Sequence, residues 1–257
     1  MQRVLKFKKT LIAITIVMSS VSALIVYALA GLGARPVVFA DPPVFVEQYA
    51  AKFQNAAPFA VDIQPATNCT YIDQSEIAEL STEKQLVRNV FFCNESPDGF
   101  LRLFTHPERE QRVKIAAAFA TLNAEFTHNE ESGFPERREQ FWEDSGEHLP
   151  AIRNALSEAL IAAAEQGERS YIPYTLAWMP GQGHETVELF AWATEHHPDW
   201  WDRRFCVFFV VEFGGDEALA KMVLKNRIHD PDYRVRKAAF DQRVRRFREM
   251  IGIAETA

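Results

Sequence analysis

Residues 11–34 contain no charged side chain and are mostly apolar. The basic residues that precede them are Arg3, Lys6, Lys8 and Lys9. A run of about 20 uncharged, apolar residues is long enough to cross a bilayer as a helix, and basic residues hold their side of it in the cytoplasm. The run therefore predicts a transmembrane or signal helix within residues 1–34, with everything after Arg35 exported.

Two fates of this helix remain open. An uncleaved helix makes a single-pass protein of the cell membrane with an extracytoplasmic domain, periplasmic in a Gram-negative bacterium. Cleavage after a small-x-small site, Ala28-Leu29-Ala30 or Val38-Phe39-Ala40, makes a secreted or periplasmic protein. The apolar run is longer than the roughly 7 to 15 residues of a typical signal core, which favours the anchor.

Residues 35–74 are expected to form a tether rich in proline, with one short helix over residues 44–56. Cys69 in the tether and Cys93 beyond it flank a polar segment, and an oxidising compartment makes a disulfide between them plausible. Two unrelated thiols are the alternative. Cys206, inside an apolar run, is expected to be buried and free.

Residues 75–257 are expected to form an all-α extracytoplasmic domain, because apolar residues recur there at helical spacing. The clearest stripe runs from Ile152 to Ala163. A second runs from Ile115 to Phe126, and a third from Phe240 to Ile251. Residues 127–150 are acidic and contain Gly133, Pro135 and Gly146, so they are expected to be mostly loop.

The segment 181–204 resembles the segment 214–237, 33 positions later. Each copy contains His-x-Pro-Asp-aromatic, followed by a basic residue four positions after the acid. Proline suits the first position of a helix, an acid suits its positive end, and the arginine one turn later is expected to pair with that acid at the surface. The same Pro-acid-x-x-x-Arg pattern occurs at Pro97 and Pro107.

With Asp230-Pro231 and Val235-Arg236 at their expected places, residues 184–250 resemble HEAT-like helical repeats, and residues 98–126 resemble them less fully. The resemblance implies two stacked helical hairpins whose second helices begin at Pro198 and Pro231. On this interpretation residues 205–211, Phe-Cys-Val-Phe-Phe-Val-Val, form a buried helix with Phe205, Phe208 and Phe209 in the core. A buried strand is the alternative.

Few residues suggest catalysis. The net charge of −7 argues against nucleic-acid binding, which needs clustered cations. His184, His196 and His197 are weak metal-ligand candidates, but their spacing matches no common ligand pattern. No cofactor motif is present, and no nucleophile elbow. An exported, hydrolase-like enzyme, with or without a metal ion, whose site lies near residues 171–202 is the alternative to a binding protein.

The function that the sequence favours is therefore a membrane-tethered, extracytoplasmic interaction module without catalysis of its own. Its partner is expected to be a protein, with an acidic protein as one candidate. Aromatic and arginine side chains most often carry binding energy. The candidate contact residues are Trp200, Trp201, Tyr233, Arg243 and Arg246.

Overall fold

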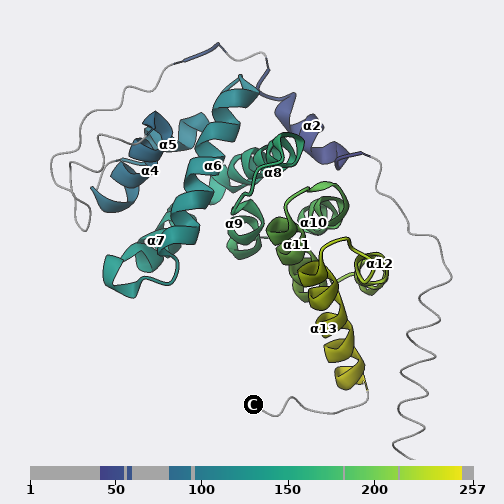
Figure 1. The fold of residues 1–257 in the computed structure, drawn as a ribbon. Helices are drawn as coiled ribbons and strands as arrows, with labels where there is room; N and C mark the ends of the chain where they lie inside the picture. Colours follow the sequence, from purple (N-terminus) through teal and green to yellow (C-terminus); the bar gives the residue numbers. More distant parts are fainter. Residues whose placement is uncertain are drawn as a thin grey trace, which may run out of the picture. The chain divides into compact units, whose positions relative to one another are not determined.

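The structure, a computed structural model, describes residues 41–54, 57–59, 81–93, 96–181, 183–213 and 215–250. Every regular element in these ranges is a helix, which confirms the all-α class (Figure 1). The elements are α2 (Val44–Ala50), α4 (Thr82–Phe92), α5 (Asp98–Leu103), α6 (Arg109–Phe126), α7 (Phe134–Asp144), α8 (Leu149–Gln166), α9 (Ile172–Trp178), α10 (His184–His196), α11 (Trp200–Phe213), α12 (Glu217–Arg227), α13 (Tyr233–Met250) and the 3-10 turns Glu130–Ser132 and Gly146–His148.

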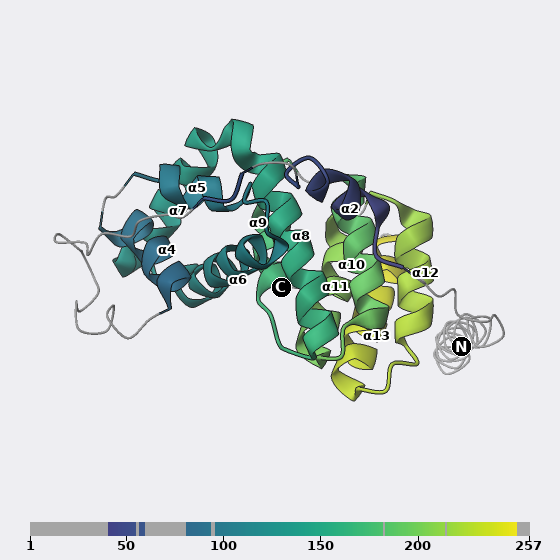
Figure 2. The ribbon, with the colours of Figure 1, turned by 90° about the horizontal axis from the view of Figure 1, so that it is seen from above.

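The helices from α6 onward form two rows. In one row α6, α9, α11 and α13 contact each other in that order, and in the other α8, α10 and α12 do so. The consecutive pairs α8–α9, α10–α11 and α12–α13 connect the rows, and Figure 2 shows α8, α10, α11, α12 and α13 side by side. Short connections force neighbours within a pair to run in roughly opposite directions. Gly167 shows this locally: it ends α8 at φ +74°, a conformation that glycine adopts without strain.

Helices α4 to α7 share a core of phenylalanine rings. The ring of Phe91 has its centroid 5.1 to 6.2 Å from those of Phe100, Phe119, Phe134 and Phe141. All five side chains are buried. Rings at these separations add attraction to the hydrophobic gain from burying large apolar surfaces. The predicted stripe from Ile115 to Phe126 supplies the α6 side of this core and is confirmed as buried.

The apolar run 205–211 is helical, as predicted, and lies within α11. Only one of its three phenylalanines is fully buried. Phe209 is 2% exposed, Phe205 is half-buried, and Phe208 is 38% exposed. The prediction that all three lie in the core was wrong, because consecutive positions on a helix point about 100° apart and α11 is open on one side.

The predicted loop at 127–150 was also wrong, because α7 occupies its middle. Gly133, at φ +65°, and Pro135 lie at the start of that helix, and Gly146 follows its end. Proline and glycine therefore mark the boundaries of α7 and do not interrupt it. The acidic residues of the segment occupy largely exposed positions, while Phe134, Phe141 and Trp142 are buried.

Several predictions about the N-terminal part fall outside the described residues. These include the membrane or signal helix and Cys69, so the Cys69–Cys93 disulfide stays a prediction. Among the helices that the structure does describe, none combines the length and the apolar character needed to cross a bilayer. Within the predicted tether, α2 packs against α8 through the buried Val46. Cys206 is buried and free, as predicted.

Candidate functional site

Helix α11 begins at a hydrogen-bonded turn. Asp199 caps the helix by accepting a hydrogen bond at Oδ1 from the Trp201 amide at 2.8 Å, and its own amide donates to Nδ1 of His197 at 3.3 Å. Nη1 of Arg203 donates to the carbonyl oxygens of His197 and Pro198 at 2.8 and 2.6 Å. The arginine thus satisfies backbone groups that burial would otherwise leave unpaired.

Helix α13 begins in the same way, 33 residues later. The amide of Asp232 donates to Oδ1 of Asp230 at 2.9 Å, so an aspartate takes the place of the histidine. Nη1 of Arg236 donates to the carbonyl oxygens of Asp230 and Pro231 at 2.7 and 2.8 Å. Residues 106–112, before and at the start of α6, form the corresponding bonds. Three helix starts therefore share one arrangement.

The three arginines differ in what the other edge of the guanidinium meets. Nε and Nη2 of Arg112 bind both oxygens of the buried Glu158 at 2.7 and 2.6 Å. The same atoms of Arg203 bind both oxygens of Asp230 at 3.0 and 2.9 Å, which joins the start of α11 to the start of α13. In the described part of the chain, Nε and Nη2 of Arg236 have no such partner.

These contacts correct the sequence interpretation of the motif. Pro198 and Pro231 lie two residues before their helices, and the acid that follows each proline precedes the first helical residue. The arginine reaches back past that acid, because side chains on a helix lean toward its N-terminus. The Pro97 copy is different: Arg102 is exposed and lies 4.4 Å from the ring centroid of Phe59.

The predicted binding aromatics lie near arginines of the same chain. The guanidinium of Arg234 lies 3.4 Å from the ring centroid of Trp200, and that of Arg169 lies 5.6 Å from the centroids of both Trp200 and Trp201. Cation–π contacts of this kind hold both tryptophans, which are half-buried. Tyr233 is 64% exposed and is the most accessible of the three.

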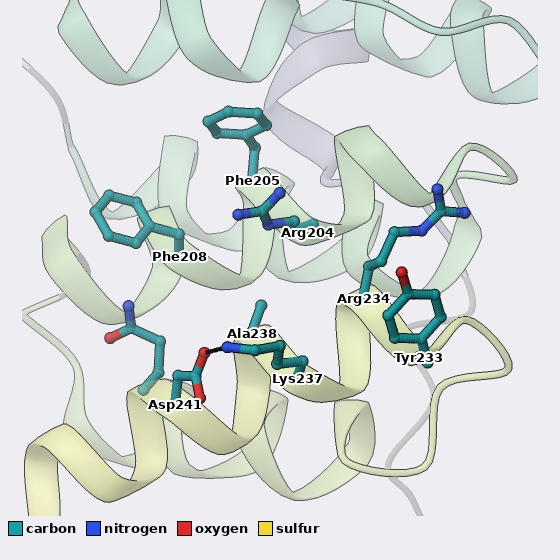
Figure 3. A pocket seen from close by; sticks show the side chains of 9 residues that line it. Arg204, Phe205, Phe208, Tyr233, Arg234, Lys237, Ala238 and Asp241 are labelled. Carbon is teal, nitrogen blue, oxygen red and sulfur yellow. Dashed lines mark hydrogen bonds and ion pairs between the residues drawn. The ribbon is translucent and has the colours of Figure 1, made fainter.

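A groove of about 500 Å³ lies between α11 and α13 (Figure 3). Its lining combines exposed aromatic rings with basic side chains. In Figure 3 the labelled residues rise from the two helices, with Arg204, Phe205 and Phe208 on α11 and the others on α13. The lining consists of Arg204, Phe205, Phe208, Tyr233, Arg234, Lys237, Ala238, Asp241 and Gln242.

The charges in this groove are unequally neutralised. Lys237 forms an ion pair with Asp241 at 2.5 Å, and Arg234 binds Asp232 through two hydrogen bonds, which lower the pKa of Asp232 to about 2. Arg204 is exposed and has no ionic partner within the described ranges. The groove therefore presents net positive charge beside apolar surface.

Arg243 and Arg246, also predicted as contact residues, do not line the groove. Both are half-buried on α13, and Nη2 of Arg246 donates to the carbonyl oxygen of Val211 at 3.0 Å. The sequence interpretation missed Arg204, Phe208 and Lys237. The 33-residue shift that relates the two copies places Arg204 opposite Lys237, so a cation at both positions was the available signal.

The three candidate histidines do not converge. His184 begins α10, is exposed, and lies 3.2 Å from Glu188. His196 ends the same helix and stacks on Trp192, with ring centroids 5.0 Å apart. Twelve helical steps separate the two by roughly 18 Å. Where the structure describes the chain, it groups no three His, Cys, Asp or Glu side chains in an arrangement suited to a metal ion.

His197 belongs to a buried cluster with Asp202 and Ser170. Asp202 accepts hydrogen bonds from the Ser170 amide at 2.8 Å and from its hydroxyl at 3.2 Å. Nε2 of His197 lies 3.6 Å from Oδ2 of Asp202. Burial lowers the pKa of His197 to about 4 and raises that of Asp202 to about 7. At neutral pH the imidazole is therefore uncharged, and both side chains are at most 1% exposed.

The chain matches no protein-family profile, no curated protein and no solved structure in comparisons of each kind. The functional argument therefore depends on the geometry of the helices themselves.

Proposed function

We propose that the helical domain is an interaction module that holds an acidic segment of a protein partner in the groove between α11 and α13. The observation that carries the proposal is the composition of the groove: Arg204, which has no ionic partner among the residues that the structure describes, lies beside the exposed rings of Phe208 and Tyr233. Aromatic and arginine side chains dominate binding energy at protein interfaces, and a positive surface steers and selects an acidic partner.

The fold is of a kind suited to this role. Two rows of paired helices and three equivalent helix starts support the resemblance to HEAT-like repeats, and stacked repeats offer extended surfaces for binding. On this interpretation one face of each repeat packs on its neighbour, while the sides of α11 and α13 that line the groove stay open to a partner.

We extend the proposal to location: the module is tethered to the cell membrane and faces away from the cytoplasm. The support is the uncharged run of residues 11–34 behind four basic residues. A reporter that is active only after export, fused behind Ala257, is expected to be active. Activity of a reporter that functions only in the cytoplasm would contradict this part of the proposal.

The alternative of an exported enzyme near residues 171–202 gains less support. Its most suggestive pair, His197 and Asp202, is buried. A general base must lie within reach of the proton that it abstracts from a bound substrate. Neither side chain lines the groove between α11 and α13.

The proposed function is tested by capture from solubilised membranes of the native host, with quantitative mass spectrometry of the bound proteins. The double variant Arg204→Glu with Lys237→Glu is expected to lose the specific partner, and binding to the wild type is expected to weaken as salt rises. Arg248→Glu is the matched control, because Arg248 is an exposed cation of α13 outside the groove. Equal retention of the same proteins by both variants would contradict the proposal.

A further inference from the structure

The inner faces of α11 and α13 correspond residue by residue. A shift of 33 positions places Asp202 opposite Val235, and Cys206 opposite Ala239. All four side chains are almost completely buried, with exposures of 0 to 1%. The two helices therefore stand in the same relation to the core, and the remaining faces can be compared position by position.

One flank of each helix differs in how far other helices cover it. On α11 this flank carries Arg203, Val207 and Val210, which are 7%, 0% and 0% exposed. Asp230, at the end of the α12 hairpin turn, binds the arginine through both oxygens. The pair α12–α13 therefore covers this flank of α11, and the carboxylate of Asp230 binds the arginine at the start of the flank.

The matching flank of α13 is not covered by any helix that the structure describes. Arg236, Phe240 and Arg243 occupy the positions of Arg203, Val207 and Val210. Arg236 and Phe240 are exposed, Phe240 by 54%, and Arg243 is half-buried. Met250, further along the same stripe, is 72% exposed. Spacings of four and ten residues place Arg236, Phe240 and Met250 on one face of α13, which we call the end face.

The orientation of Arg236 is already fixed. Its Nη1 atom makes the same two carbonyl bonds as Nη1 of Arg203, so its Nε–Nη2 edge points away from α13 as that of Arg203 points away from α11. A guanidinium held in this way is preorganised to bind a carboxylate through two parallel hydrogen bonds. Because the guanidinium is already held in place, binding the carboxylate of a partner costs little further side-chain entropy.

Charge identifies the partner. Residues 233–250 of α13 contain seven Lys or Arg and two Asp or Glu. Arg234, Lys237 and Arg245 pair with acids of the chain, whereas Arg236, on the end face, has no acidic partner among the described residues. We propose that the end face is a docking site for an acidic amphipathic helix of a partner protein. Apolar residues of that helix cover Phe240 and Met250, and one Asp or Glu seats in the fork of Arg236. This surface is separate from the groove and does not depend on the proposed function.

The probe is a synthetic amphipathic helix with a leucine stripe, flanking glutamates and an Asp-Pro start, labelled for fluorescence anisotropy with the full chain. Wild-type protein is expected to bind it, and Arg236→Gln to weaken binding roughly tenfold or more, as expected for a charged hydrogen-bonded pair. Arg236→Lys is expected to recover little, because an ammonium cannot reproduce the fork. A peptide in which Asn replaces the Asp that binds Arg236 is expected to lose as much affinity for the wild type as the original peptide loses for Arg236→Gln. Against Arg236→Gln, the same replacement is expected to cause little further loss.

Arg248→Glu, at an exposed cation of α13 that lies neither in the groove nor on the end face, is the matched control and is expected to bind the probe about twofold more weakly at most. An unchanged melting temperature of Arg236→Gln verifies that the variant is folded. Absence of binding to the wild type, or equal losses from Arg248→Glu and Arg236→Gln, would overturn the proposal. So would tighter probe binding by Glu255→Gln, which would show that the chain's own C-terminal segment fills the fork. Concentration-dependent dimerisation lost in Arg236→Gln would instead identify a second copy as the occupant.

Discussion

The starts of α6 and α13 are built from the same bonds and end in opposite situations. Arg112 closes its turn and then binds the buried Glu158, whereas Arg236 closes its turn and meets no acid at its other edge within the described ranges. One short sequence pattern thus serves as an internal connection in one place and as an exposed surface in another. The difference lies in what the rest of the chain supplies opposite the arginine.

The largest effect is expected where the connection is closed and buried. Arg112→Ala is expected to lower the free energy of unfolding by about 3 to 5 kcal/mol, because it strands Glu158 without a partner. Urea unfolding followed by circular dichroism measures this loss. A loss below about 1 kcal/mol would show that the Arg112–Glu158 pair contributes no more to stability than Arg236 does.

A matched pair of phenylalanines extends the comparison to packing. Phe209→Ala in α11 is expected to cost about 3 to 5 kcal/mol, because it leaves a cavity among the rings of Phe190 and Phe205. Phe240→Ala in α13 is expected to cost less than about 1 kcal/mol, because that ring is mostly exposed. Equal losses in the same unfolding assay would mean that the end face of α13 is covered.

The start of α11 differs from both others in carrying titratable groups whose pKa values burial has shifted. His197, with its pKa lowered to about 4, resists a proton that the unfolded chain accepts below about pH 6.5, so its contribution to stability rises with pH across that window. Asp202, with its pKa raised to about 7, keeps a proton that the unfolded chain releases above about pH 4, so its contribution falls with pH.

The contributions of His197 and Asp202 to the free energy of unfolding change with pH in opposite directions. Together they are therefore expected to change the stability of the wild type little between about pH 4 and 6.5. Asp202→Asn removes the falling contribution. Stability of that variant relative to the wild type is expected to rise with pH, by on the order of 3 kcal/mol at most. Unfolding curves at several pH values test the slope, and a parallel pH dependence of both proteins would refute the assignment.

The smallest effect is expected at the open end. Arg236→Ala is expected to change the free energy of unfolding by less than about 1 kcal/mol, since Arg236 is exposed and pairs with no buried acid in the described residues. Differential scanning calorimetry beside Arg112→Ala makes the contrast direct. A loss as large as that of Arg112→Ala would mean that an undescribed part of the chain already fills the fork.

The sequence by itself determined the class of fold and much of its register. Helical spacing located the core stripes of α6 and α8, and the 33-residue shift identified equivalent positions in α11 and α13. These features are local, since apolar periodicity and helix starts are set by residues a few positions apart. The same local logic misplaced residues 127–150, where glycine and proline bound a helix and do not exclude one.

The contact surface was decided only by the tertiary structure. Phe208 and Phe209 are adjacent and identical in type, yet one lines a groove and the other is buried. Trp200 meets Arg234 and Arg169, and Arg203 meets an aspartate 27 residues away, whereas Arg236, in the same motif, meets none in the described chain. Exposure and ionic pairing depend on which distant helix packs opposite a side chain, and a local pattern holds no information about that neighbour.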